Sequence, residues 1–172
     1  MGVGVNQSGI PPKSRLRHGL VASVLVLYTL FILAVTLSPT QLDVSSQRLV
    51  FRFVDVLHRF GVPTWFDYAE VEFSANIAMF IPFGFMVTLL IPSRFAWLAV
   101  FISLSFSTGI EFFQREFLDE RVFDPRDIVA NTIGGTIGYV MAAILRSLVH
   151  GRDKRIIARA LWQARRGLPP TG

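Results

Sequence analysis

The sequence predicts an all-α, polytopic membrane protein with a bundle of four transmembrane helices. Three observations support this fold class. Hydrophobic residues make up 52% of the 172 positions, and the mean hydropathy of +0.49 is too high for an ordinary soluble domain. Apolar runs of bilayer length recur along the chain. Basic residues gather on the flanks that these spans would place on one side of a membrane.

The first predicted span is the uncharged apolar run Leu20–Leu37, which Pro39 ends. Three basic residues precede it, as they would precede the apolar core of a signal peptide. The run is longer than such a core and has no small-x-small cleavage site, so an uncleaved transmembrane helix is favoured. The preceding segment 1–19 has Gly and Pro punctuation without apolar periodicity, which predicts a flexible cytoplasmic tail.

The segment Gln47–Phe60 predicts an amphipathic interfacial helix in the first outer loop. Its charged residues recur at helical spacing, and they are Arg48, Arg52, Asp55 and Arg59. Apolar residues fill the other side, so the helix suits a membrane surface and is too charged to span. Trp65 and Tyr68 follow it and suit an aromatic belt at the water boundary.

Three further spans are predicted at Phe73–Ile91, Phe95–Phe113 and about Ile128–Val149. The very short turn between the second and third spans makes them antiparallel neighbours. Pro82 lies inside the second span, close to Gly84, and predicts either a kink or a carbonyl satisfied by neighbouring groups.

The distribution of charge predicts the orientation. With both termini in the cytoplasm, that side holds 11 of the 17 Lys and Arg residues, and Asp153 is its one acidic residue. The net charge of +5 is therefore a topology signal, and it does not indicate nucleic-acid binding. The prediction is a multi-pass protein of the bacterial cytoplasmic (inner) membrane, with membrane lipids around it and no nucleic-acid partner.

Three pairs of polar residues fall at the outer ends of the predicted spans. In each pair an acid precedes an amide by three or four residues, and the pairs are Glu72 and Asn76, Glu111 and Gln114, and Asp127 and Asn131. Helical spacing places each pair on one face. Such groups are costly in hydrocarbon, so they should face the bundle interior or a wet cavity. Amides acting as helix-packing contacts and acids acting as caps are the alternative interpretation. Three pairs at one depth favour an outer polar pocket.

Several carboxylates in a low dielectric need a cation or a proton beside them. The simplest cations are Arg121 and Arg126 in the loop before the last span. A divalent metal is the other candidate, although no metal site or cofactor is predicted. With 0 Cys and three scattered His residues, thiolate chemistry and local zinc sites are excluded. No nucleophile stands beside an obvious base, so catalysis remains open and binding is preferred.

The last span and the tail carry two further patterns. Gly134 and Gly138 form a small-xxx-small face, which favours close packing of helices within the molecule over packing between molecules. The segment 150–172 combines an apolar side with many basic residues, which predicts a basic cytoplasmic tail helix resting on the anionic leaflet. Residues 20–149 then form the membrane domain. The oligomeric state is left open.

Three sequence blocks together resemble the VanZ-like family of bacterial membrane proteins. They are EFSANIAMFIPFG, STGIEFFQ and RVFDPRDIVANTIGGTIG, which span residues 72–138. The positions that match the family are Glu72, Asn76, Phe80, Pro82, Gly84, Glu111, Gln114, Arg121, Asp124, Asp127, Asn131, Gly134 and Gly138. Arg126 departs from the family pattern, in which an acidic or small residue often stands there.

The resemblance implies a multi-pass protein of the cell envelope. The founding member of the family is associated with low-level resistance to the glycopeptide antibiotic teicoplanin. We therefore expect an outer-facing polar pocket that engages a lipid-linked or envelope glycan group. Two alternatives remain open. One is an enzyme acting on such a lipid, with an acid among Glu72, Glu111 and Asp127 as general acid or base, and the other is a small proton-coupled transporter or assembly partner.

Overall fold

The computed structural model describes residues 15–37, 44–117 and 124–165, and every regular element in these ranges is helical. In chain order these elements are α1 (Arg15–Thr36), α2 (Val44–Arg59), α3 (Tyr68–Leu90), the 3-10 helix η1 (Ser93–Phe95), α4 (Leu98–Phe117) and α5 (Pro125–Arg165). The prediction of an all-α protein is confirmed.

Three of the described helices are long and apolar enough to cross a membrane. They are Leu16–Thr36, Tyr68–Leu90 and Pro125–Arg152. The sequence predicts a further span at Phe95–Phe113, where the structure has α4. The second half of α4 carries Glu111, Gln114 and Arg115, which lower its mean hydropathy. The structure thus supports a membrane protein with three candidate spans in the described ranges, and the fourth span stays a prediction.

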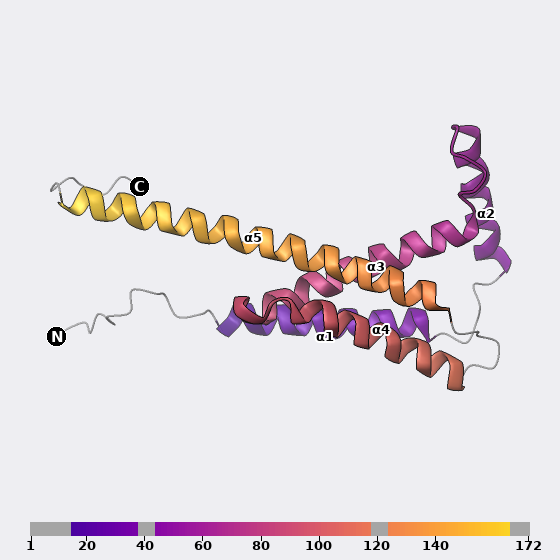
Figure 1. The fold of residues 1–172 in the computed structure, drawn as a ribbon, viewed down its shortest axis with the longest axis horizontal. Helices are drawn as coiled ribbons and strands as arrows, with labels where there is room; N and C mark the ends of the chain where they lie inside the picture. The colour runs from indigo at the N-terminus through magenta and orange to yellow at the C-terminus, as the bar shows by residue number, and fades with distance from the viewer. Residues whose placement is uncertain (1–14, 38–43, 118–123, 166–172) are drawn as a thin grey trace.

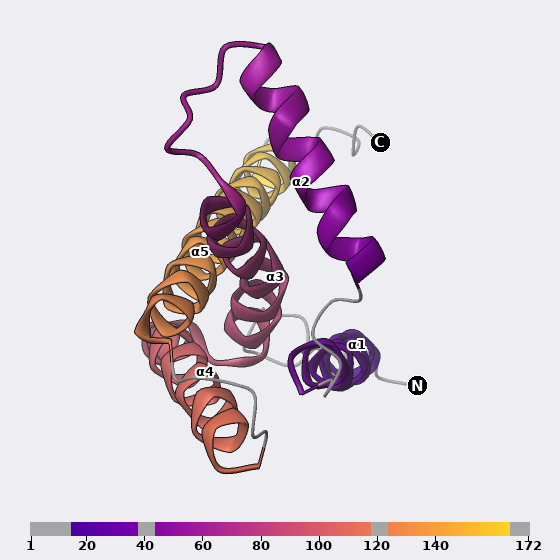
Figure 2. The ribbon, with the colours of Figure 1, turned by 90° about the vertical axis from the view of Figure 1, so that its right-hand side faces the viewer.

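The helices α1, α3, α4 and α5 form an elongated bundle, and α2 lies across one of its ends (Figures 1 and 2). At the opposite end α1 begins and α5 ends (Figure 1). The most extensive contact joins α3 and α5, which cross each other, and α4 and α1 pack against this pair. The pair α3 and α5 is therefore the centre of the fold.

Glycines bring the backbones of α3 and α5 into direct contact. A Cβ added at Gly84 would overlap the backbone of Gly135, and one at Gly134 would overlap the carbonyl of Ile77. A Cβ at Gly138 would also overlap the α3 backbone. Without side chains between them, the two helices gain close dispersion contacts, which is how helices associate in membranes. The glycine face of α5 is used within the molecule.

Aromatic rings fill the space that α3 shares with α4 and α1. The buried apolar core consists of Ile32, Phe80, Phe83, Val87, Ala99 and Ile110. The ring of Phe83 stacks on that of Phe106 with 4.9 Å between centroids. From α1, the Tyr28 hydroxyl donates a hydrogen bond of 2.8 Å to the carbonyl of Met79. This bond fixes α1 against the middle of α3.

A capping box sets the start of α3. The Asp67 carboxylate accepts a hydrogen bond of 2.8 Å from the Ala69 N–H, and the Glu70 carboxylate accepts one of 3.1 Å from the Asp67 N–H. The hydrogen bond from the Ala69 N–H, and after it a side-chain hydrogen bond with Glu70, lower the pKa of the Asp67 carboxyl. The helix consequently begins five residues before the predicted start at Phe73. Pro82 lies inside α3, which continues on both sides of it.

The outward faces of the bundle are apolar. Large exposed side chains include Val24, Leu27, Leu30, Phe31, Phe101, Phe112, Val140, Met141, Ile144 and Leu145. Apolar surface of this extent suits a hydrocarbon surrounding and would be a liability in water. These side chains are distributed over α1, α4 and α5, so each of the three helices has a face suited to lipid.

The helix α5 is continuous over 41 residues. At 1.5 Å per residue it is about 60 Å long, roughly twice the thickness of a hydrocarbon core. The sequence predicts a span that ends near Val149 and a separate tail helix that lies on the membrane. In the structure the tail, as far as Arg165, prolongs the span in the same direction (Figure 1). The reason is that Gly151 alone does not break a helix that has no proline after its first residue.

Candidate functional site

The helices α3 and α5 begin, and α4 ends, at one end of the bundle (Figure 1). The sequence places a group of carboxylates at this end. We call it the acidic end, and it is defined by Glu70, Glu72, Glu111, Asp124 and Asp127. The side chains of three helices that are distant in sequence meet here. The contacts between side chains at the acidic end therefore depend on how α4 and α5 pack on the other helices of the bundle.

Asn76 and Asp127 connect α3 to α5 at the acidic end. The Asn76 amide Nδ2 donates a hydrogen bond of 2.8 Å to Asp127 Oδ1. Asp127 lies in the first turn of α5, where a carboxylate also interacts favourably with the helix dipole. Both side chains are half-buried. This hydrogen bond therefore joins the acid of one predicted pair, Asp127, to the amide of another predicted pair, Asn76.

Asn131 lies one turn further along α5 and is 4% exposed. Its Nδ2 donates a hydrogen bond of 2.9 Å to the hydroxyl of Ser107 on α4, which is fully buried. Its Oδ1 has no hydrogen-bond partner within the described part of the chain. Buried acceptors are nearly always satisfied, so this oxygen marks a place where a further donor would be stabilised.

Glu111 on α4 is 4% exposed and binds the beginning of α5. Its Oε2 accepts a hydrogen bond of 3.1 Å from the Asp124 N–H. Asp124 in turn accepts one of 2.8 Å from the Arg126 N–H, as an N-cap followed by Pro125 at the first helical position. A buried carboxylate from one helix thus holds the N-terminus of another.

Of the remaining predicted residues, one contacts α1, one is exposed on α3, and one is outside the described residues. Gln114 is buried, and its Nε2 donates a hydrogen bond of 2.8 Å to the Thr36 carbonyl at the end of α1. Glu72 is exposed on the side of α3. Arg121 lies in the range 118–123, outside the described residues. The structure joins Asn76 to Asp127 and Glu111 to Asp124, whereas Gln114 fastens α4 to α1.

Arg126 is a cation at the acidic end. Its Nη2 lies 3.3 Å from Glu70 Oε1, and its guanidinium carbon lies 5.7 Å from the centre of the Phe73 ring. The two charged side chains are 54% and 28% exposed, so the pair contributes at most about 1 kcal/mol to stability. Arg126 was predicted from the sequence as a cation of the site, whereas Glu70 was not predicted as a site residue. The Asp67-x-x-Glu70 capping pattern was the signal that could have found it.

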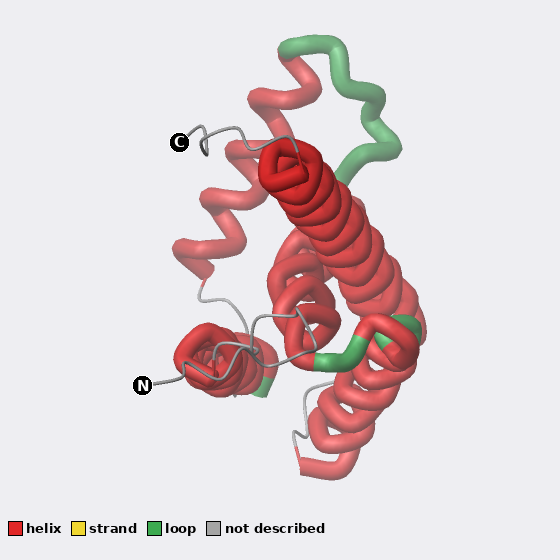
Figure 3. The backbone as a smooth tube through the Cα atoms, turned by 90° about the vertical axis from the view of Figure 1, so that its left-hand side faces the viewer, coloured by secondary structure: helices red, strands yellow, loops and turns green. Residues whose placement is uncertain are grey.

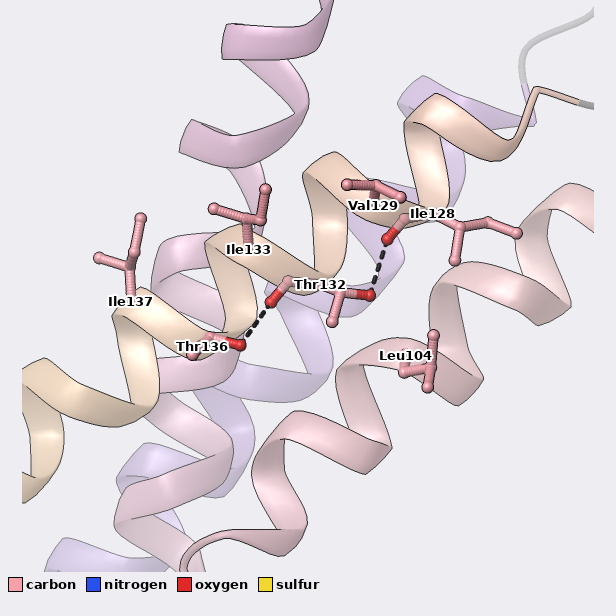
Figure 4. Close-up of a pocket in the computed structure, with 7 residues that line it drawn as sticks. All are labelled: Leu104, Ile128, Val129, Thr132, Ile133, Thr136 and Ile137. Atoms are coloured by element: carbon pink, nitrogen blue, oxygen red, sulfur yellow. Dashed lines mark hydrogen bonds between the residues drawn. The ribbon is translucent and has the colours of Figure 1, made fainter.

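An apolar groove of about 390 Å³ runs along α5 next to the acidic end (Figure 4). Its walls are Leu104, Ile128, Val129, Thr132, Ile133, Thr136 and Ile137. The Thr132 and Thr136 hydroxyls donate hydrogen bonds of 2.7 and 2.8 Å to main-chain carbonyls of their own helix. Both hydroxyl groups therefore already donate a hydrogen bond, and an apolar occupant of the groove would leave neither of them unpaired. Its first residue, Ile128, directly follows Asp127.

Comparison with known protein families shows to which family the chain belongs. The family model described as VanZ/LLP1 matches residues 23–146, which include most of α1, all of α2, α3 and α4, and α5 as far as Arg146. The chain belongs to the VanZ/LLP1 family. No curated protein and no solved structure matches it. The family resemblance drawn from the three sequence blocks is confirmed.

In this VanZ-family protein, α4 carries a buried polar stripe that was not predicted from the sequence. Ser103, Ser107 and Glu111 follow one another at four-residue spacing, and all three are buried. A Cβ at Gly135 would overlap the Ser103 side chain, so the stripe faces α5. The spacing was a signal for a polar helix face, but only the position of α5 shows that this face is covered.

The chemistry available at the acidic end of the VanZ-family chain is that of oxygen acceptors and amide donors. Within the described ranges, no group of three or more His, Cys, Asp or Glu residues lies together as a metal site would require. Carboxylates accept hydrogen bonds from hydroxyl groups, and carboxamides both donate and accept them. The arrangement suits a hydroxylated ligand, and the buried Glu111 suits the movement of a proton.

Proposed function

We propose that this VanZ-family protein binds the glycan head group of a lipid-linked envelope precursor. The head group would lie at the acidic end, and the lipid chain would lie in the groove along α5. The observation that carries this proposal is the direct succession of the two surfaces, since the groove begins at the residue after Asp127. A lipid-linked glycan has the same succession of a hydroxylated head and an apolar chain.

The polar groups of the acidic end support a sugar ligand. Asn131 Oδ1 has no hydrogen-bond donor among the described residues, and the neighbouring side chains of Asp127 and Glu111 are carboxylates, which is the kind of group that accepts hydrogen bonds from sugar hydroxyls. Arg126, and by prediction Arg121, would hold a phosphate linkage between sugar and lipid, because a guanidinium grips phosphate through two N–H groups. Both parts of the ligand would thereby have complementary partners.

We further propose that α4 is the fourth span, that both termini are cytoplasmic and that the protein lies in the bacterial inner membrane with α2 on its outer surface. Support comes from the burial of polar groups on α4, since Ser103, Ser107 and Glu111 face the bundle while Phe101 and Phe112 are exposed to its surroundings. A helix with this division can span a membrane despite its modest mean hydropathy.

The topology predicts that a cytoplasmic reporter fused after His150 is active and that a periplasmic reporter at the same point is inactive. Cysteines introduced at Arg52 and Arg59 in a chain without native cysteine should react with a membrane-impermeant reagent from outside. A reporter fused in the α1–α2 connection serves as the control and should give the reverse pattern. A periplasmic signal after His150 would contradict the topology.

The binding proposal predicts retention of a lipid-linked sugar. The full chain in nanodiscs should bind a polyprenyl-pyrophosphate disaccharide in a native mass spectrometry titration. Polyprenyl pyrophosphate without sugar should bind at least about tenfold more weakly, since it lacks the hydroxyl donors. Equal binding of the two lipids would remove the glycan from the proposal.

Binding of an envelope precursor would link the protein to teicoplanin, the antibiotic associated with the founding family member. We expect deletion of the protein to lower the teicoplanin concentration that inhibits growth of its host. A strain complemented with the wild-type chain is the control and should recover. An unchanged inhibitory concentration after deletion would separate this protein from resistance.

One observation favours a second candidate function, proton-coupled transport. Glu111 is a buried carboxylate, and ionisable groups within membrane helices often mark proton pathways. The serine stripe of α4 would extend this polar group toward the middle of the bundle. In this candidate Glu111 would carry a proton, and the ligand would be released when that proton leaves.

A further inference from the structure

A second cavity lies at the end of the bundle opposite the acidic end. Its volume is about 790 Å³, and it is enclosed by the start of α1, the connection from α3 to α4 and the middle of α5. Figure 3 views this end directly, with the α3–α4 connection in front of the bundle. We call it the basic end, and it is defined by the cationic or titratable residues Arg17, His18, Arg146 and His150 that line the cavity.

The lining of the cavity carries positive charge. Two arginines and two histidines line it, and none of the described residues that line it is Asp or Glu. The remaining walls include Val21, Leu90, Tyr139 and Ala143. The lining therefore combines a cationic group with an apolar wall. An occupant with complementary chemistry has an anionic part and an apolar part.

Arg146 provides the group that would hold the anion. Its Nη2 donates hydrogen bonds of 2.9 and 2.8 Å to the carbonyls of Leu89 and Ile91 at the end of α3. These bonds fix the plane of the guanidinium. Its Nη1 is buried and has no hydrogen-bond partner within the described part of the chain. A fixed guanidinium with unused donors is a strong binding group for a phosphate oxygen.

The position of the cavity indicates a membrane lipid. The candidate spans of α1 and α3 begin and end beside it, at Leu16 and Leu90, so it lies at the boundary between hydrocarbon and water. A phosphate anchored by Arg146 would lie at the level of lipid head groups. The apolar wall would then accommodate acyl chains, which an inorganic phosphate ion does not have. A lipid thus uses both parts of the lining.

We propose that the basic end is a binding site for an anionic phospholipid, whose phosphate is held by Arg146 and Arg17 and whose acyl chains lie against the apolar wall. The site is independent of the glycan site at the acidic end, so either can be absent without the other. Positive charge beside the inner leaflet attracts anionic lipids in general, and a fixed guanidinium adds a defined position for one of them.

The experiment is native mass spectrometry of the full chain in nanodiscs that contain phosphatidylglycerol and phosphatidylcholine in equal amounts. The wild-type chain should retain phosphatidylglycerol. Arg146→Lys, which keeps the charge but loses the planar fork, and Arg17→Gln should each reduce that retention about tenfold. Arg94→Gln is the matched control, because Arg94 lies at the same end without lining the cavity, and it should retain the lipid as the wild type does.

Circular dichroism of each variant establishes that it is folded, and Arg17→Gln tests the site even where Arg146→Lys unfolds. Equal retention of the two lipids by the wild type would overturn the proposal. So would an equal loss in Arg94→Gln, which would show that only overall charge matters. Inorganic phosphate is the last probe, and displacement of phosphatidylglycerol by millimolar phosphate would assign the site to the free ion.

Discussion

Replacing Gly134 by alanine is expected to lower the free energy of unfolding of the membrane domain more than a substitution at the protein surface would. The new methyl group would overlap the carbonyl of Ile77 and approach Phe80 Cβ to 2.9 Å, and neither neighbour is a flexible side-chain end. The helices α3 and α5 would have to separate, which loses their most extensive contact. Overpacking of this kind costs about 1–3 kcal/mol. Denaturant titration of the protein in detergent, followed by circular dichroism, measures the free energy of unfolding.

The control for this substitution is Gly109→Ala. Gly109 lies within α4, and a Cβ there would meet nothing within 4 Å. Alanine is a better helix former than glycine by up to about 1 kcal/mol, so this variant should be as stable as the wild type or more stable. An equal free energy of unfolding for Gly134→Ala and Gly109→Ala would contradict the close packing of α3 on α5.

Glu111→Gln is expected to weaken binding of the lipid-linked disaccharide strongly while the protein remains folded. Glutamine has nearly the same shape, and its carbonyl oxygen can still accept the hydrogen bond from the Asp124 N–H. The start of α5 should therefore keep its position. A hydrogen bond to a charged group contributes about 1.5–3 kcal/mol, so loss of the charge should weaken binding about 10- to 100-fold. Native mass spectrometry measures the binding, and protein abundance in membranes measures the folding.

Two further variants interpret that result. Glu116→Gln removes an exposed carboxylate from the same helix and should leave binding unchanged. Asn131→Ala removes the bond to Ser107 and should lower stability as well as binding. Full binding by Glu111→Gln would remove its charge from the binding mechanism. Full binding accompanied by loss of proton-coupled flux in proteoliposomes would instead favour the transport function.

The sequence was sufficient where local pattern determines structure. Apolar runs located α1, α3 and the membrane part of α5, and the charge period of Gln47–Phe60 located a helix that the structure gives as Val44–Arg59. The four-residue spacing within each polar pair, and the position of the pairs at the outer ends of the spans, predicted that Asn76 and Asp127 lie at a similar depth in the membrane. These predictions needed only the periodicity of a helix and the thickness of a bilayer.

The sequence was insufficient where the outcome depends on which helices touch. Gln114 has the same spacing from Glu111 as a site residue would have, yet it binds the main chain of Thr36, because α1 lies beside that face of α4. Arg146 was counted as a topology signal, whereas it binds carbonyls at the end of α3. Both assignments follow from packing between helices, which no local pattern contains.

The order in which the principal helices are synthesised has a consequence for biogenesis. The two helices that hold the fold together, α3 and α5, are separated in the chain by η1 and α4. When α3 leaves the ribosome, Gly84 and the Asn76 amide have no partner, since Gly135 and Asp127 have not been translated. The first helices must therefore wait within the bilayer or at the insertion machinery. A nascent chain that stalls before α5 would present an unpaired polar amide to lipid, and it would be a natural substrate for membrane quality control.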